Sequence, residues 1–147
     1  MTGRALLLER AARPLYGILL AAAAWILLRG HNAPGGGFIG GLVAVAGTAA
    51  YALLLGAAAA QRRLPLGPLP LALLGAILTL LSGLPALALD RPYLTHLWWN
   101  LPLGLIELPL STVLLFDAGV FLAVWGTLAG YVLALVRSGE TDCGEKS

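Results

Sequence analysis

The sequence has few charged residues, and this shortage excludes most classes of soluble protein. Only 11% of its 147 residues are charged, whereas an average soluble domain has about 25%. Hydrophobic residues make up 59% of the chain, and the mean hydropathy is +0.89. A compact soluble domain of this length cannot bury so much apolar surface. We therefore expect an integral membrane protein.

Cysteine and histidine are also scarce. Cys143 is the single cysteine, so neither an intrachain disulfide nor a cysteine-based metal site is expected. His31 and His96 are far apart in the sequence and form no H-x-x-x-H pattern, so we expect no bound metal. No serine or threonine has a base at a spacing suited to nucleophilic catalysis. We predict neither an enzyme nor a bound cofactor, and the small net charge of +2, without a basic stripe, argues against nucleic-acid binding.

Long apolar runs are the main feature of the chain. A membrane crossing takes roughly 20 predominantly apolar residues. Runs of that kind cover residues 11–28, 38–60, 69–89 and 112–136. We predict an all-α membrane protein with four transmembrane helices in one domain, residues 1–137, followed by a polar tail at 138–147. The first run continues past any small-residue cleavage site, so we interpret it as a retained anchor and not as a secretory signal.

The basic residues indicate how this domain lies in the membrane. An even number of crossings places both termini on one side. The terminal side carries seven basic residues: Arg4, Arg10, Arg13, Arg62, Arg63, Arg137 and Lys146. The opposite side carries only Arg29 and Arg91. By the positive-inside rule, both termini and the polar tail are predicted to be cytoplasmic.

A long apolar loop is predicted between the third and fourth spans, at residues 90–111. It is rich in leucine and contains Trp98 and Trp99, which suit a membrane interface. Pro102 and Pro109 argue against one continuous helix. We expect this segment to lie along the outer membrane surface, docked on protein, and its conformation is left open.

Glycines at the start of the second span match the dinucleotide-binding pattern G-x-G-x-x-G at residues 35–40. That pattern requires a preceding strand in a soluble βαβ unit, and here a membrane span precedes it. The pairs Gly36 with Gly40 and Gly37 with Gly41 instead have the small-x-x-x-small spacing that lets two helix backbones approach closely. We interpret them as helix-packing residues.

The fourth span contains Asp117 and two distinctive faces. A carboxylate within a membrane costs a few kcal/mol unless it is paired, solvated or protonated. Two interpretations stay open: Asp117 handles protons or cations, or its hydrogen bonds fix helix packing. Gly119, Gly126 and Gly130 cluster on the helix face opposite Asp117. Neither face suits lipid, so we expect partner subunits around this helix.

Three segments together resemble one family. They are residues 30–41 (GHNAPGGGFIGG), 92–97 (PYLTHL) and 114–121 (LLFDAGVF). In order and spacing they resemble the B-type subunit of the Mrp-type (Mnh or Sha) multisubunit Na⁺/H⁺ antiporter. Glu107 falls where that family has an acidic residue ahead of the last span.

The resemblance implies a small membrane subunit of a secondary transporter that exchanges cytoplasmic Na⁺, or another monovalent cation, for external H⁺. The implied location is a bacterial or archaeal cell membrane, and the implied partners are the other antiporter subunits and the lipid bilayer. Candidates for the ion pathway are Asp117, Glu107, His31 and His96. The alternative is a purely structural scaffold, either in this complex or in a related one such as a membrane-bound hydrogenase. An autonomous four-span exporter has less support because the chain lacks a second intramembrane charge for coupled exchange.

Overall fold

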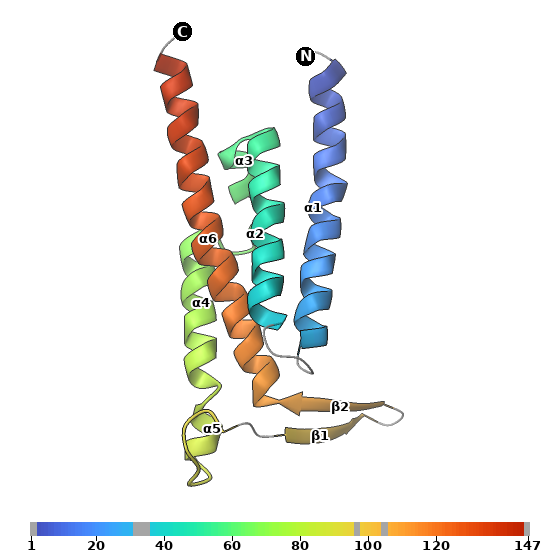
Figure 1. Ribbon diagram of the computed structural model, residues 1–147, viewed down its shortest axis with the longest axis vertical. Coiled ribbons are helices and arrows are strands. Elements are labelled where there is room, and N and C mark those ends of the chain that lie inside the picture. Colours follow the sequence, from blue (N-terminus) through green and yellow to red (C-terminus); the bar gives the residue numbers. More distant parts are fainter. Residues whose placement is uncertain (1–2, 31–35, 96–97, 104–105, 146–147) are drawn as a thin grey trace.

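The computed structural model describes residues 3–30, 36–95, 98–103 and 106–145. Most of these residues are helical (Figure 1). The elements in chain order are α1 (Gly3–Arg29), α2 (Gly36–Leu55), α3 (Ala57–Gln61), α4 (Pro68–Leu81), α5 (Leu84–Leu87), β1 (Trp98–Leu103), β2 (Ile106–Ser111) and α6 (Thr112–Glu145). Both termini lie at the same end of the molecule (Figure 1).

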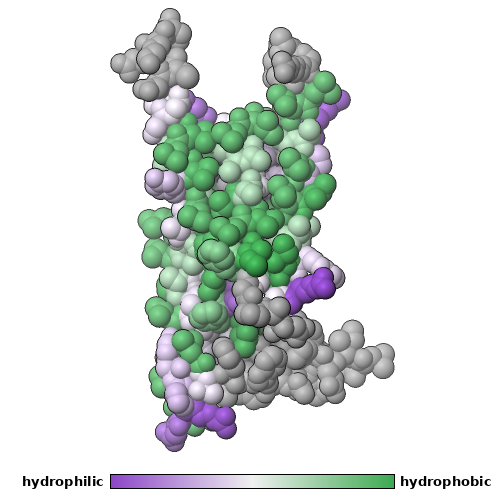
Figure 2. Space-filling model, viewed as in Figure 1, coloured by the Kyte–Doolittle hydropathy of each residue, from purple (hydrophilic) through white to green (hydrophobic). Residues whose placement is uncertain are grey.

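Four helical segments are long and apolar enough to cross a membrane. They are Arg10–Arg29, Gly36–Leu55, Pro68–Leu87 and Thr112–Thr141. A helix of 20 residues is about 30 Å long, which matches the hydrocarbon thickness of a bilayer. Hydrophobic residues cover much of the visible surface between the two ends of the bundle (Figure 2). The predicted all-α fold with four transmembrane helices is confirmed.

The four long helices are arranged in a row and not as a closed bundle. In order across the row they are α1, α2, α6 and α4 (Figure 1), and neighbouring helices in this order make most of the contacts between helices. The core lies mainly where α1, α2 and α6 meet, and it includes Tyr16, Ala44 and Trp125. Large apolar side chains on the two outer helices stay exposed, among them Trp25 on α1 and Ile77 on α4. Lipid or other proteins must cover them in a membrane.

The second predicted span, 38–60, is divided at Gly56. Helix α2 ends at Leu55, and the short helix α3 begins at Ala57. Gly56 has φ +90°, which glycine adopts readily because it has no Cβ. The backbone N–H of Ala57 donates to Glu140 Oε1 at 3.1 Å, so α6 holds the start of α3 in place.

The described part of the polar tail, residues 138–145, continues the last transmembrane helix, because α6 extends to Glu145. The hydroxyls of Ser138 and Thr141 donate to carbonyls one turn earlier, those of Ala134 and Arg137. Bonds of this kind satisfy polar side chains without breaking a helix. Helix α6 has 34 residues and a length of about 50 Å, so it is longer than a bilayer is thick.

The loop whose conformation the sequence left open contains an antiparallel β-hairpin. Strand β1 pairs with β2 in a register that places Trp98 opposite Ser111 and Leu103 opposite Ile106. Pro102 and Pro109 both lie in this hairpin, which is consistent with the confinement of proline to edge strands, since both strands of a hairpin are edges. The hairpin projects sideways at the end of the molecule opposite the termini (Figure 1).

Candidate functional site

Asp117 lies on α6, five residues after the helix begins at Thr112. This distance corresponds to about 7.5 Å along the axis, which places Asp117 nearer to the end of the span than to its middle. The residue is buried, with 9% of its surface exposed. A Cβ added at Gly37 would lie 2.2 Å from the Asp117 carbonyl oxygen. Asp117 is therefore covered by the first turn of α2.

The two glycine pairs of α2 contact two different helices of the same chain. An added Cβ at Gly40 would lie 2.8 Å from the carbonyl oxygen of Ala23 on α1. An added Cβ at Gly41 would lie 2.9 Å from Cβ of Val124 on α6. Helix α2 can lie between its neighbours at this distance only because both sides carry glycine.

The glycine face of α6 packs against α4. An added Cβ at Gly119 would lie 2.4 Å from the hydroxyl oxygen of Thr79, and one at Gly126 would lie 2.4 Å from the backbone nitrogen of Ala72. From α4, an added Cβ at Gly75 would lie 2.2 Å from the backbone nitrogen of Ala123. Both distinctive faces of α6 are thus covered near Asp117 and Gly119 by α2 and α4. At these positions the two faces are covered by helices of the same chain.

A buried polar contact joins α2 to α6 deeper in the core, and the sequence reasoning missed it. Trp125 Nε1 donates to Thr48 Oγ1 at 3.0 Å, and Thr48 Oγ1 donates to the Ala44 carbonyl at 2.9 Å. Tyr16 of α1 is also buried, and its ring lies 5.4 Å from that of Tyr51, centroid to centroid. The signal in the sequence was a polar residue, Thr48, within an apolar run, with Trp125 near the middle of the last span.

The segment 92–97 begins with a tight turn. The backbone N–H of Thr95 donates to the Pro92 carbonyl at 3.1 Å, and Leu94 has φ +67°. The Tyr93 hydroxyl donates to the Leu80 carbonyl at 2.6 Å, which fastens the turn to the end of α4. An added Cβ at Gly83 would lie 2.3 Å from the Tyr93 ring, so this tyrosine requires a glycine beneath it.

The described residues do not give the side-chain surroundings of the other three ion-pathway candidates. His31 and His96 lie outside the described residues. The backbone of Glu107 lies in β2, where Glu107 pairs with Pro102. Sequence reasoning thus selected four candidates, and the described structure gives the surroundings of one, Asp117.

Three comparisons with known proteins point to the same family. A family described as a domain related to the MnhB subunit of Na⁺/H⁺ antiporter matches residues 7–130. The chain is 36% identical over 124 residues to the B-type subunit of the Na⁺/H⁺ antiporter of Bacillus subtilis, covering 82% of this chain and 85% of the relative. It is 30% identical over 133 residues to the corresponding Na⁺/H⁺ antiporter subunit of Alkalihalophilus pseudofirmus, covering 89% of this chain and 92% of that protein.

A solved structure shows the same arrangement of helices. The chain is similar to part of the Mrp complex from a Dietzia species, with a TM-score of 0.76 and 34% sequence identity. The match covers 90% of this chain but only 14% of the matched chain. Sequence and structure therefore agree on one conclusion: the chain belongs to the family of domains related to the MnhB subunit of Na⁺/H⁺ antiporters.

Proposed function

We propose that this chain is the B-type subunit of an Mrp-type multisubunit Na⁺/H⁺ antiporter and that the assembly of the complex requires it. The observation that carries the proposal is the match to B-type antiporter subunits over most of their length. The row of four helices supports it, because the exposed apolar residues of α1 and α4 are available for neighbouring membrane subunits. Deleting the chain should abolish Na⁺-dependent antiport by the remaining complex, and unchanged antiport without it would contradict the proposal.

We propose that both termini face the cytoplasm. The common end of the molecule at which both termini lie (Figure 1) also carries most of the basic residues, as the positive-inside rule requires of a cytoplasmic side. Cys143, the single cysteine, provides a probe. A membrane-impermeant maleimide should label this chain in inverted vesicles but not in right-side-out vesicles, with a Cys143→Ser variant as the control. Labelling only in right-side-out vesicles would reverse the orientation.

We propose that Asp117 takes part in ion movement. A carboxylate in a largely buried, partly hydrated position can hold either a proton or Na⁺, so the two ions would compete for it. Under the proposed orientation Asp117 lies toward the outer surface, since α6 begins at that end and runs to the cytoplasmic C-terminus. Glu107, His31 and His96 are proposed to lie on the approach from outside.

The test is Na⁺-dependent proton antiport in inverted vesicles that contain the whole complex. Asp117→Asn keeps the size and hydrogen-bonding capacity of the side chain but removes its charge, and Asp90→Asn in the outer loop is the matched control. We expect the Asp117 variant to assemble, as judged on a native gel, and to lose most antiport. Full antiport by an assembled Asp117→Asn complex would exclude this role.

The second candidate function is a scaffold with no part in ion movement, in this or a related membrane complex such as a hydrogenase. Two observations favour it: the close glycine contacts between helices and the position of Asp117 near the end of its helix. A scaffold role predicts that Asp117→Asn leaves antiport intact. The same vesicle experiment therefore separates the two functions.

A further inference from the structure

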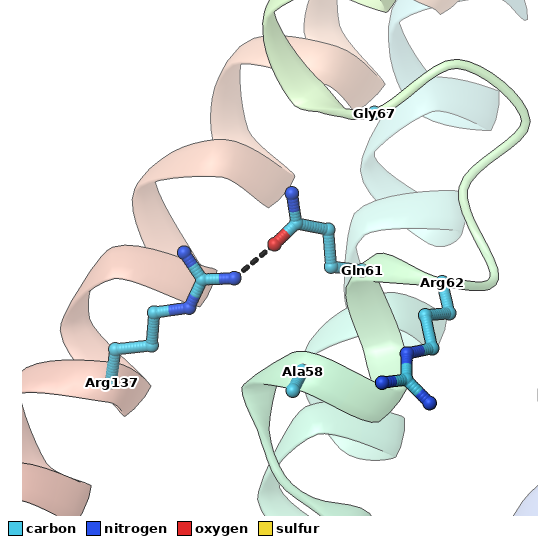
Figure 3. A pocket seen from close by; sticks show the side chains of 5 residues that line it. All are labelled: Ala58, Gln61, Arg62, Gly67 and Arg137. Atoms are coloured by element: carbon cyan, nitrogen blue, oxygen red, sulfur yellow. Dashed lines mark hydrogen bonds between the residues drawn. The ribbon is translucent and has the colours of Figure 1, made fainter.

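Two pockets follow each other along the line where α4 packs on α6, and their chemistry differs. We define the arginine pocket as the open pocket of about 410 Å³ lined by Ala58, Gln61, Arg62, Gly67 and Arg137 (Figure 3). We define the seam pocket as the pocket of about 230 Å³ lined by Pro68, Leu69, Ala72, Gly126, Thr127 and Gly130. The first is basic, and the second is almost entirely apolar.

The arginine pocket contains two cations, and among the side chains that the structure describes neither has an acidic partner. Arg137 donates through Nη2 to Oε1 of Gln61 (Figure 3). That bond uses one of the five N–H donors of the guanidinium group. Arg62 extends from the end of α3 on the other side of Gln61, and its guanidinium group points away from Arg137 (Figure 3). Glu140, the carboxylate one turn beyond Arg137, accepts the backbone N–H of Ala57. The donors that remain can bind an anion, and arginine is particularly suited to phosphate.

The seam pocket lies on the same side of α6 as Arg137. Gly130 precedes Arg137 by seven residues, which is about 20° short of two full turns and about 10 Å along the helix axis. On α4, the seam pocket begins at Pro68, the residue directly after Gly67 of the arginine pocket. A chain that left the arginine pocket toward the membrane interior would therefore enter the seam pocket.

We propose that these two pockets together bind one anionic phospholipid. The phosphate of its headgroup binds Arg137, Arg62 adds a second positive charge on the far side of the arginine pocket, and the first part of an acyl chain occupies the seam pocket beside Leu69 and Gly130. The basic charge favours an anion, and the apolar pocket two turns deeper favours hydrocarbon on the same molecule. The arginine pocket lies toward the end of the row with the chain termini, where basic pockets between membrane helices recognise anionic headgroups, and the seam pocket lies nearer the middle of the last span. This inference goes beyond antiport and does not depend on the role of Asp117.

The test uses the assembled complex, purified in detergent through a tag on this chain. The probe is phosphatidylglycerol with a light-activated diazirine on one acyl chain, and the adducts are mapped by mass spectrometry. We expect adducts within residues 68–72 and 126–130. Replacing both pocket arginines, as Arg62→Gln with Arg137→Gln, should lower the adduct yield by at least about tenfold, because the change at Arg137 removes a charge-assisted hydrogen bond and the change at Arg62 removes a second positive charge from the pocket.

The matched control replaces two exposed arginines at the opposite end of the molecule, as Arg29→Gln with Arg91→Gln, and it should leave the adduct yield unchanged. Thr127→Trp fills the seam pocket from an exposed position and should lower the yield while both pocket arginines remain. Arg62→Gln alone changes an exposed residue and should also lower the adduct yield. This single variant replaces the double variant if the double variant does not assemble. Yields are compared at equal assembly on a native gel.

Competition with unlabelled compounds distinguishes a lipid headgroup from free phosphate as the ligand of the arginine pocket. Excess unlabelled phosphatidylglycerol should suppress the adducts, and inorganic phosphate at the same concentration should not. The proposal is overturned if the pocket variants are labelled as strongly as the wild-type chain. It is also overturned if a phosphatidylcholine probe labels the same residues equally well, or if inorganic phosphate displaces the lipid.

Discussion

Replacement of Gly75 by alanine tests the helix row at one of its closest contacts. An added Cβ there would lie 2.2 Å from the backbone nitrogen of Ala123, 2.6 Å from the Gly119 carbonyl oxygen and 2.7 Å from Cα of Ala123. Ordinary van der Waals contact begins at 3.4 Å, so the two helices must separate locally by about 1.2 Å, the difference between 3.4 and 2.2 Å. The obstructing atoms are backbone atoms, which cannot rotate away as a side chain would.

The expected loss of stability follows from the cost of placing an extra methyl group in a packed interior. An extra methyl group in a well-packed interior costs typically about 1–3 kcal/mol. For a protein of this size, 1 kcal/mol corresponds to a change of about 2–4 °C in Tm. We therefore expect Gly75→Ala to lower, by several degrees, the temperature at which this chain dissociates from the complex. The assay is a native gel of purified complex after heating through a series of temperatures.

Gly17→Ala is the matched control. Gly17 also lies within a membrane helix, but nothing lies within 4 Å of an added Cβ. Alanine is favoured over glycine in a helix interior by roughly 0.5–1 kcal/mol, so this variant should be as stable as the wild-type complex or slightly more stable. If Gly75→Ala retained wild-type stability, or if Gly17→Ala lost as much, the close α4–α6 packing described above would be wrong.

Three further variants test other contacts. Thr48→Val keeps the shape of the side chain but leaves Trp125 Nε1 without its acceptor, so it should lower the stability of the protein by about 1–3 kcal/mol. In the same thermal assay, the exposed variant Thr127→Val should leave the stability unchanged. Gly56→Ala places a Cβ at φ +90° and should destabilise by about 1–2 kcal/mol, whereas Gly139→Ala, which has open space around it, should not; equal Tm values would contradict the strain at Gly56. Tyr93→Phe removes the bond to the Leu80 carbonyl and should speed amide hydrogen exchange of residues 90–95, measured by mass spectrometry, without affecting α2; unchanged exchange would show that the bond does not hold the turn.

The sequence predicted the four spans because each is an apolar run of about 20 residues, which has one stable form in lipid. Spacing alone also selected the glycines of α2 and α6. The spacing did not identify the helices that these glycines contact, because a small residue indicates close approach by another helix but not which helix that is. The glycine spacing therefore did not show that α2 and α4 of the same chain cover α6 near Asp117.

Two features were not predictable in the same way. The apolar run 38–60 contains no proline or charge, so nothing in its pattern distinguishes Gly56, where the helix breaks, from the glycines that pack within it. In the outer loop, Pro102 and Pro109 excluded a helix but did not specify a strand. The usable signal was two apolar stretches of six residues separated by Gly104 and Leu105, a spacing typical of hairpins.

The position of both chain ends at one end of the helix row has an evolutionary consequence. A unit that enters and leaves on the same side can be joined to a longer membrane polypeptide, or released from it, without inverting the helices of either part. The matched region of the Dietzia complex is 14% of its chain, so there the unit is covalently part of something much larger. A fusion of this kind would alter the number of polypeptides and preserve the topology of the membrane domain.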